Sequence, residues 1–430
     1  MKKSLMFLLV TIVAVAIVVT MTLAGCKKEA VSETTTAAET TAAATTAAET
    51  TVAETTAAED MNAIDPFILA VREPWEKLKG ITDLSWKGPL GETPLLDSDL
   101  FLTKAEVEKI KAGKPDGTPY TYAIAANNTA GEYSLAMNAG PNSGLWEYME
   151  YLGVKQVAFA SAEFDPVKQK ADVESMLALK PDVIVAYATD PVTGAANFKP
   201  AVDAGIPLAF ISTVPDGYTY GKEFIGISTN NPYEEGIYLA KETFDLYGDD
   251  AKVGYVFYDD VYFVCNYLDK GYIEYADKNY PNWTVYKQGF VAETGAGDSA
   301  AALILQHPDI EVFYTTYMVP AMHIVAALTE AGRDKDVGVV TFAIDAPTLI
   351  NMIEGGPIKA ICTDSPYLVG MNHAIQAACA LIGKELKQPN FIVCPTTMLR
   401  KENVREIWKS AMGSVPIPDS VLQALDKAGL

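Results

Sequence analysis

The sequence has few of the residues with which proteins hold metal ions. It contains three histidines and five cysteines in 430 residues, and no two cysteines stand in CxxC spacing. Metal sites need several such ligands at short, regular intervals. The glycines of GAGDSAAA (295–302) lack the lysine of a phosphate-binding loop and the spacing of a dinucleotide-binding loop. The sequence therefore predicts no metal site and no cofactor.

Basic residues are also scarce, with 33 lysines and arginines against 55 acidic residues and a formal net charge of −22. From Met61 onward the counts are 29 basic and 48 acidic residues, which gives 29 − 48 = −19. Nucleic-acid binding depends on lysine and arginine, so this balance argues against a nucleic-acid partner. It also argues against a strongly anionic ligand, and a neutral ligand is the simplest expectation.

The first 26 residues have the pattern of an export signal. Lys2 and Lys3 precede an apolar run over about 5–23, and the run ends at Leu-Ala-Gly-Cys26. This ending resembles the lipobox of bacterial lipoproteins, in which the cysteine becomes the lipid-modified N-terminus. The alternative is an uncleaved membrane helix. We expect Cys26 to anchor the mature protein to the outer side of the cell membrane through a lipid.

Residues 27–61 form a low-complexity tract of threonine, alanine and glutamate. The tract has no aromatic residue, so it cannot bury enough apolar surface to offset the entropy lost on ordering. We predict a disordered tether between the anchor and a folded body of about 370 residues, a length that suits two lobes. Tethers of this kind also carry surface enzymes, so the tract alone does not indicate a function.

From Pro119 onward short apolar strands alternate with amphipathic helices, and the cycle begins again after about residue 229. Such alternation predicts parallel sheets with right-handed crossovers. The expected fold class is α/β, with two Rossmann-like lobes. Within the first cycle, one long helix is expected over 133–152. Residues 62–118 are interpreted as an N-terminal extension packed on the first lobe, with Thr103 and Glu106 as a capping box.

Five segments, in order, carry a resemblance to a known family. They are AIAANNTAGEYSLAMNAG, LKPDVIVAYATDP, AVDAGIPLAFIST, HPDIEVFYTTYMVPAMHIVAALTEAGR and CTDSPYLVGMNHAIQA. Over about 119–400 the chain resembles the ribose/galactose-type periplasmic binding proteins (type I). The resemblance implies a three-segment hinge, with lobe 1 over 119–229 and 365–392 and lobe 2 over 230–364 and 393–415. It also implies ligand capture by lobe closure and delivery to the membrane permease of an ABC transporter.

The sequence departs from the ribose-binding pattern at the positions that the family uses for specificity. Ser212 and Thr213 stand where the resemblance implies an aspartate–arginine pair, and Asn266 where it implies an arginine. Ala343 replaces an aspartate and Tyr317 an asparagine. Ribose itself is therefore not predicted, and the expected ligand is another sugar or polyol.

A polyol is held by aromatic faces that cover its C–H surface and by carboxylates or amides that bind its hydroxyl groups. Parallel sheets place such side chains at the carboxyl ends of their strands. The predicted ligand-binding residues are Asn128, Glu132, Tyr133, Tyr187, Asp190, Thr213, Asp259, Asn266, Glu293, Tyr317, Asp345 and Asp364. No catalytic residue is predicted.

Each of these candidates has a structural alternative. The loop 127–133 would equally serve as a helix cap with an acidic first turn, and Asp190 as a turn or capping residue. His307 and His323 are interpreted as structural. The four cysteines after Cys26 are interpreted as buried apolar thiols, although the strand-like positions of Cys362 and Cys394 leave a disulfide between them open.

Three functions remain compatible with these observations. The first is an extracytoplasmic solute-binding lipoprotein of an ABC transporter, which is not an enzyme. The second is a sensor that presents its liganded form to a membrane receptor. The third is a surface glycosidase, which would need two carboxylates at catalytic separation. A transcription regulator of the same two-lobed fold is excluded, because an export signal replaces the helix-turn-helix.

Overall fold

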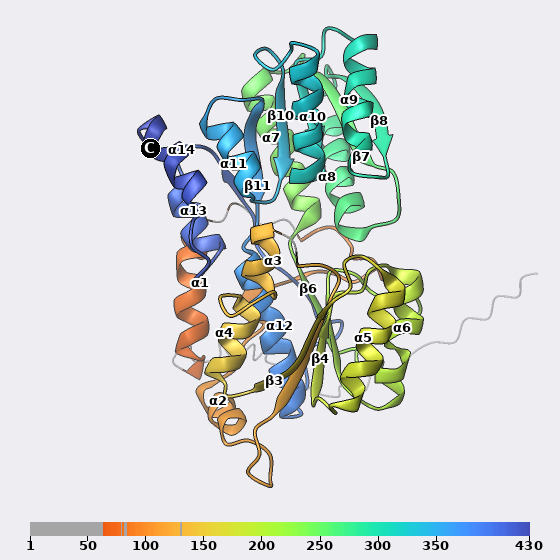
Figure 1. Ribbon diagram of the computed structural model, residues 1–430, viewed down its shortest axis with the longest axis vertical. Coiled ribbons are helices and arrows are strands. Elements are labelled where there is room, and N and C mark those ends of the chain that lie inside the picture. Colours follow the sequence, from red (N-terminus) through yellow and green to blue (C-terminus); the bar gives the residue numbers. More distant parts are fainter. Residues whose placement is uncertain (1–62, 79, 81–83, 130) are drawn as a thin grey trace, which may run out of the picture. The chain divides into compact units, whose positions relative to one another are not determined.

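The computed structural model describes residues 63–430 except 79, 81–83 and 130. The predicted export signal, Cys26 and the whole tether over 27–61 therefore lie outside the described residues. The described chain forms two α/β lobes, each built on one sheet (Figure 1). This confirms the predicted fold class.

The sheet of lobe 1 has seven strands in the order β1-β12-β6-β5-β4-β2-β3, and all its neighbours are parallel. The strands are β1 (Leu95–Leu96), β2 (Thr121–Ala126), β3 (Lys155–Ser161), β4 (Val183–Ala186), β5 (Leu208–Ile211), β6 (Gly226–Thr229) and β12 (Phe391–Val393). Strands β4, β5 and β6 are buried along their whole length. A parallel sheet covered on both faces requires such continuous apolar strands, and the sequence supplies them.

The sheet of lobe 2 has six strands in the order β13-β11-β10-β9-β7-β8. They are β7 (Lys252–Tyr258), β8 (Thr284–Phe290), β9 (Val312–Thr315), β10 (Gly338–Phe342), β11 (Ile358–Thr363) and β13 (Thr397–Leu399). Only β13 runs antiparallel to its neighbour. The carboxyl ends of the other strands therefore meet at one edge of the sheet.

Helices cover the sheets in closely packed groups (Figure 1). In lobe 1, α3 (Gly131–Met137) and α4 (Gly144–Tyr151) pack on α12 (Pro366–Leu381), and α5 (Pro166–Ala178) packs on α6 (Pro191–Asp203). In lobe 2, α7 (Pro232–Tyr247) packs on α8 (Phe263–Asn279), and α9 (Gly295–Gln306) packs on α10 (Met318–Glu330). The remaining helix of that lobe, α11 (Ala346–Ile353), packs on α14 (Asp419–Ala428).

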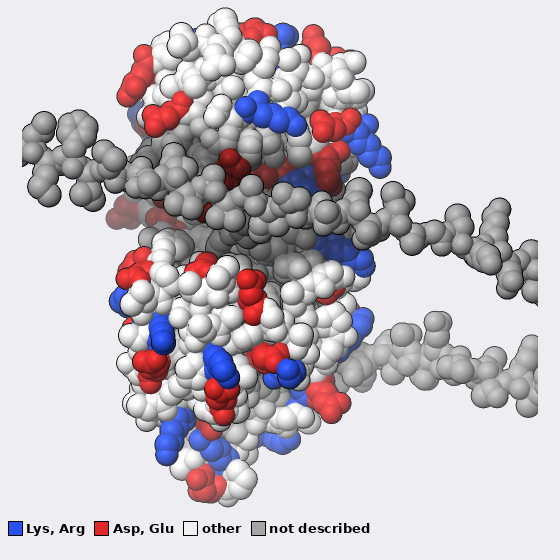
Figure 2. Space-filling view, turned by 90° about the vertical axis from the view of Figure 1, so that its right-hand side faces the viewer, with Lys and Arg blue, Asp and Glu red and all other residues white. Residues whose placement is uncertain are grey.

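Helices of lobe 1 carry exposed ion pairs between lysine and aspartate side chains. Lys168 pairs with Asp172 and Lys199 with Asp203, both at i,i+4 spacing. Figure 2 shows basic and acidic side chains side by side on this lobe. Exposed pairs of this kind contribute little to stability. Buried carboxyl groups therefore have a larger effect on the stability of this chain than the exposed pairs do.

The single helix predicted over 133–152 is wrong. Two helices, α3 and α4, occupy this stretch, and Gly140 and Pro141 lie in the turn between them. Proline lacks the N–H that would continue a helix. Ser143 then caps the second helix, since its side chain accepts a hydrogen bond from the Trp146 N–H at 3.2 Å.

The N-terminal extension contacts both lobes. It contains α1 (Pro66–Leu78) and α2 (Lys104–Lys111), and the predicted capping box of Thr103 and Glu106 is present at the start of α2. Its strand β1 joins the sheet of lobe 1. Its Trp86 packs on Phe391 of lobe 1 and on Phe263 of lobe 2, with ring centroids 5.6 and 6.3 Å apart. The expectation of packing on the first lobe alone is therefore incomplete.

The chain crosses between the lobes three times, after β6, β11 and β12, as the resemblance implies for the hinge. The third crossing is held by α1, because Trp75 donates to the Pro395 carbonyl at 3.1 Å and Thr397 donates to the Leu78 carbonyl at 2.7 Å. The helix α13 (Val404–Ala411) follows this crossing. Terminal segments from both ends of the sequence thus brace the hinge.

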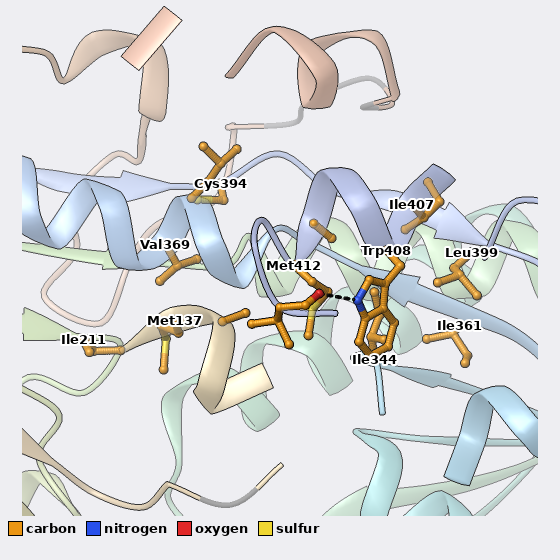
Figure 3. Close-up of a cluster of buried hydrophobic side chains, with 14 of the residues drawn as sticks. Met137, Ile211, Ile344, Ile361, Val369, Cys394, Leu399, Ile407, Trp408 and Met412 are labelled. Carbon is orange, nitrogen blue, oxygen red and sulfur yellow. Dashed lines mark hydrogen bonds between the residues drawn. The ribbon is translucent and has the colours of Figure 1, made fainter. Parts of the chain in front are cut away.

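One hydrophobic cluster runs from lobe 1 through the hinge into lobe 2 (Figure 3). Met137 and Val369 belong to lobe 1, and Ile344 and Ile361 to lobe 2. Trp408 of α13 lies in this cluster, 1% exposed, and its indole N–H donates to the Val415 carbonyl at 2.9 Å. The C-terminal segment therefore belongs to the core.

Trp408→Ala is expected to lower the free energy of unfolding by about 3–5 kcal/mol, because it leaves a cavity in this cluster. Urea denaturation followed by circular dichroism measures the effect. Leu305→Ala is the matched control, since Leu305 is 85% exposed and its truncation should change stability by less than about 0.5 kcal/mol. Equal effects of the two changes would contradict the placement of Trp408 in the core.

Candidate functional site

Polar and aromatic side chains follow the carboxyl ends of strands in both lobes. Tyr187 follows β4 and Thr213 follows β5 in lobe 1, whereas Asp259 follows β7 and Tyr317 follows β9 in lobe 2. Ligands of open parallel α/β sheets bind at this edge. Figure 2 shows the surface hollowed between the two lobes, with acidic side chains visible in the hollow.

The first contact between the lobes joins two predicted site residues. The Tyr133 hydroxyl of α3 donates to Asp364 Oδ2 at 3.0 Å, and Asp364 lies at the crossing that follows β11. The Asp364 side chain is fully buried. Burial raises the pKa of its carboxyl group to about 7. Both residues were predicted as ligand-binding residues, and they are 231 positions apart in the sequence.

A second buried carboxyl group lies beside this pair and was not predicted. Glu235, in the first turn of α7, accepts a hydrogen bond from Asn230 Nδ2 at 2.6 Å. Burial, and then the charge of Asp364, raise the pKa of Glu235 well above its ordinary value. Glutamate in a first helical turn usually serves the helix dipole. The sequence therefore gives no signal that separates Glu235 from its neighbour Glu234.

The second contact between the lobes joins two tyrosines. The Tyr187 hydroxyl of lobe 1 hydrogen-bonds to the Tyr262 hydroxyl of lobe 2. Burial raises the pKa of both phenols, most strongly that of Tyr262. Tyr187 was predicted as a site residue, whereas Tyr262 was missed because it lies in an irregular loop before α8. Two aromatic rings, one from each lobe, therefore meet here.

Tyr317 and Glu293, which were both predicted as ligand-binding residues, lie together in lobe 2. The Tyr317 hydroxyl donates to Glu293 Oε1 at 2.9 Å. Burial, then the neighbouring Cys265 and Glu293, raise the pKa of Tyr317. Tyr258 packs edge to face on Tyr262 and on Phe290, with ring centroids 6.4 and 5.6 Å apart.

Three predicted residues have structural partners of their own. Asp190 caps α6 by accepting from the Thr193 N–H at 2.8 Å, and Asp345 caps α11 by accepting from the Thr348 N–H at 2.9 Å. Asn266 accepts from the Tyr262 N–H at 2.9 Å and therefore orients the loop that carries Tyr262. Each of these three side chains therefore has a structural role, and a ligand contact at each stays a prediction.

The other four predicted residues are spread more widely. Thr213 is buried beside the hinge, and Asn128 accepts a hydrogen bond from the Ser134 hydroxyl at 3.4 Å. Glu132 is half-buried and lines a hollow of about 310 Å³ with C-terminal residues. Asp259 is exposed and lines a hollow of about 610 Å³ along β7 and α8. The structure does not bring Glu132 and Asp259 together with the buried Tyr133–Asp364 pair.

The cysteines and helices of the described part of the chain bear on three further predictions. No group of three His, Cys, Asp or Glu side chains there could hold a metal ion. Cys265, Cys362, Cys379 and Cys394 are free and buried, so the open disulfide between Cys362 and Cys394 is not formed. The described helices include none that is long and apolar enough to cross a membrane.

The family model that matches the chain is described as a periplasmic binding protein domain and covers residues 127–385. No curated protein matches the sequence. Among solved structures, the chain is similar to an ABC transporter solute-binding protein from Agrobacterium vitis bound to α-D-tagatopyranose. The two share 21% identity and a TM-score of 0.59, over 66% of this chain and 96% of that one.

Two further structures show the same fold. An arabinose-binding protein from Geobacillus stearothermophilus has 18% identity and a TM-score of 0.58, over 66% of this chain and 98% of that one. An ABC transporter solute-binding protein from Mycobacterium smegmatis with bound glycerol has 18% identity and a TM-score of 0.58, over 69% and 98%.

Proposed function

Because the chain belongs to the periplasmic binding protein family, we propose that it captures a sugar or polyol and delivers it to the membrane permease of an ABC transporter. The family consists of extracytoplasmic ligand binders, which agrees with the prediction that the protein is not an enzyme. The observation that supports the proposal most directly is the pair of contacts between the lobes, Tyr133 with Asp364 and Tyr187 with Tyr262.

These residues have the chemistry that a polyol needs. Phenol rings cover C–H surface, and carboxylate oxygens accept hydrogen bonds from hydroxyl groups. The structural neighbours that bind a sugar or glycerol support this ligand class. The site residues come from both lobes, so a ligand that touches them binds the closed arrangement more tightly than the open one. Differential affinity of this kind shifts the population toward closure.

The proposed cellular setting follows from the N-terminal sequence. A lipid on Cys26 and a tether over 27–61 would hold the binding lobes near the membrane in which the permease lies. A single tether of this length restricts the protein to a shell of a few tens of Å around its anchor, which raises the local concentration at the permease. Radiolabelled palmitate incorporation that is lost in Cys26→Ala tests the anchor.

Calorimetric titration of the purified full-length protein with monosaccharides and polyols tests ligand capture. We expect at least one saturable ligand, and we expect Tyr187→Ala and Tyr262→Ala to weaken its binding by tenfold or more. That factor corresponds to about 1.4 kcal/mol, the range of a lost aromatic contact. Tyr286→Ala is the matched control, because Tyr286 stacks on His307 outside the strand-end edge. Turnover of a glycoside instead of binding would contradict the proposal.

A further inference from the structure

The buried carboxyl groups at the hinge lack a positive partner. Glu235 and Asp364 are fully buried, and Glu235 Oε1 and Asp364 Oδ1 have no hydrogen-bond partner among the described residues. Neither group forms an ion pair with a lysine or arginine in that part of the chain. A buried carboxyl oxygen without a partner costs free energy, so this arrangement calls for a donor from outside the chain.

Arg72 is a buried arginine, and its guanidinium group already has partners elsewhere. Arg72 donates to the Leu100 carbonyl at 2.9 Å and to Asn372 Oδ1 at 2.8 Å, and its guanidinium lies 3.6 Å from Asp97. Arg72 influences Cys394 but is not among the groups that shift the pKa of Glu235 or Asp364. The buried guanidinium group of Arg72 is therefore paired with the Asp97 carboxylate, and not with Glu235 or Asp364.

The groups that face the two carboxyls are themselves acids or neutral dipoles. They are Tyr133 of α3, Asn230 at the first crossing, Glu234 of α7 and Cys362 of β11. Of these groups, the Tyr133 hydroxyl donates to Asp364 Oδ2 at 3.0 Å and Asn230 Nδ2 donates to Glu235 at 2.6 Å. The two carboxyl groups have oxygens without a partner, and the phenol of Tyr133 lies beside them. Among the described residues, no lysine or arginine forms an ion pair with either group. Such surroundings favour a cation.

Resting on the proposed function, we infer that the ligand carries a protonated amine next to its hydroxyl groups, as in an amino sugar or amino polyol, and that the amine binds at Glu235 and Asp364. An ammonium group has three donors, enough for Glu235 Oε1 and Asp364 Oδ1 together. Two neighbouring hydroxyl groups could also donate to both oxygens, but they carry no positive charge to balance two buried carboxylates. The inference replaces the neutral ligand that the overall charge predicts by a cationic one.

The amine also explains how the site tolerates two adjacent carboxyls. Without a ligand, a proton on the pair relieves their repulsion. When an ammonium group enters, both carboxyls become charged and the proton is released to solvent. Binding therefore becomes tighter as pH rises from 5.5 to 7.5, as long as the ligand amine stays protonated. A polyol without an amine gains nothing from this ionisation.

Matched ligand pairs test the inference on the full-length protein. Glucosamine is compared with glucose, galactosamine with galactose, and 1-amino-1-deoxysorbitol with sorbitol, by calorimetry at pH 5.5 and pH 7.5. We expect one amine to bind at least 100-fold more tightly than its parent, with more proton release at the lower pH. Proton release is read from titrations in two buffers of different ionisation enthalpy.

Glu235→Gln should remove most of the preference for the amine over its parent, and Asp364→Asn is the second variant if the first does not fold. Glu274→Gln is the matched control, since Glu274 is an exposed residue of α8 that accepts from the Tyr233 hydroxyl at 3.0 Å. Equal or tighter binding of a parent sugar overturns this inference and leaves the proposed function standing. Binding of neither member of any pair counts against both, and an amine preference that survives both variants overturns the assigned position.

Discussion

Gly236→Ala is expected to lower the free energy of unfolding by about 3 kcal/mol or more, although alanine is the better helix former. A Cβ atom on Gly236 of α7 would lie 2.1 Å from the Leu268 carbonyl oxygen of α8. The contact is reciprocal, because a Cβ on Gly271 of α8 would lie 2.1 Å from the Tyr233 carbonyl oxygen. Backbone atoms cannot rotate away, so the two helices would have to separate.

Urea denaturation of the single and double variants checks this expectation. Gly295→Ala is the control, because a Cβ there would meet only Phe290 Cβ at an ordinary 3.7 Å. The double variant of Gly236 and Gly271 should lose less than the sum of the single losses, since one separation relieves both clashes. A Gly236→Ala protein as stable as the Gly295→Ala protein would show that the helices do not pack this closely.

Glu235→Gln is expected to stabilise the ligand-free protein at pH 8 and to change its stability little at pH 4.5. The pKa of Asp364 is raised to about 7 and that of Glu235 well above its ordinary value, in both cases first by burial. Between the ordinary carboxyl pKa of about 4 and these raised values, the unfolded chain has lost protons that the folded chain keeps. Stability therefore falls as pH rises through this window.

The size of the effect follows from the same linkage. Each unit between the folded and unfolded pKa is equivalent to about 1.4 kcal/mol, and an amide in place of the carboxyl group has no such dependence. Melting temperatures of both proteins from pH 4.5 to pH 8 measure it. Asp269, whose pKa burial raises to about 8, contributes the same slope to both proteins. Parallel pH profiles would contradict the buried, proton-retaining state of Glu235.

The elements of the fold were readable from the sequence because each has a local cause. The bounds of α7 have such a cause, because Pro232 begins the helix and Gly248 ends it. The strand β5 lies in a short apolar run that follows the glycine and proline at 205 and 207, and a run of this length favours a buried strand over a helix. The break between α3 and α4 was missed because helical periodicity on both sides outweighed Gly140 and Pro141.

The sequence could name a candidate site residue only where the position of that residue after a strand indicates its role. The resemblance places ligand contacts at strand ends and at the hinge. This is the reason for which Tyr133, Tyr187 and Asp364 were predicted as ligand-binding residues. Glu235 and Tyr262 were missed because burial and contact across the lobes depend on distant segments. Asp190 and Asp345 cap helices and their ligand contacts stay predictions, since a capping carboxylate and a ligand-binding carboxylate look identical in a sequence.

The four buried thiols have a practical consequence for measuring this protein. Thiol-reactive dyes attack the thiolate, and burial raises the pKa of Cys265, Cys362, Cys379 and Cys394. A cysteine introduced on the surface of one lobe would thus be the preferred reaction site for a maleimide dye among the described residues. An environment-sensitive fluorophore placed beside the hinge would report lobe closure directly, and the protein could serve as a reagentless optical sensor for its own ligand.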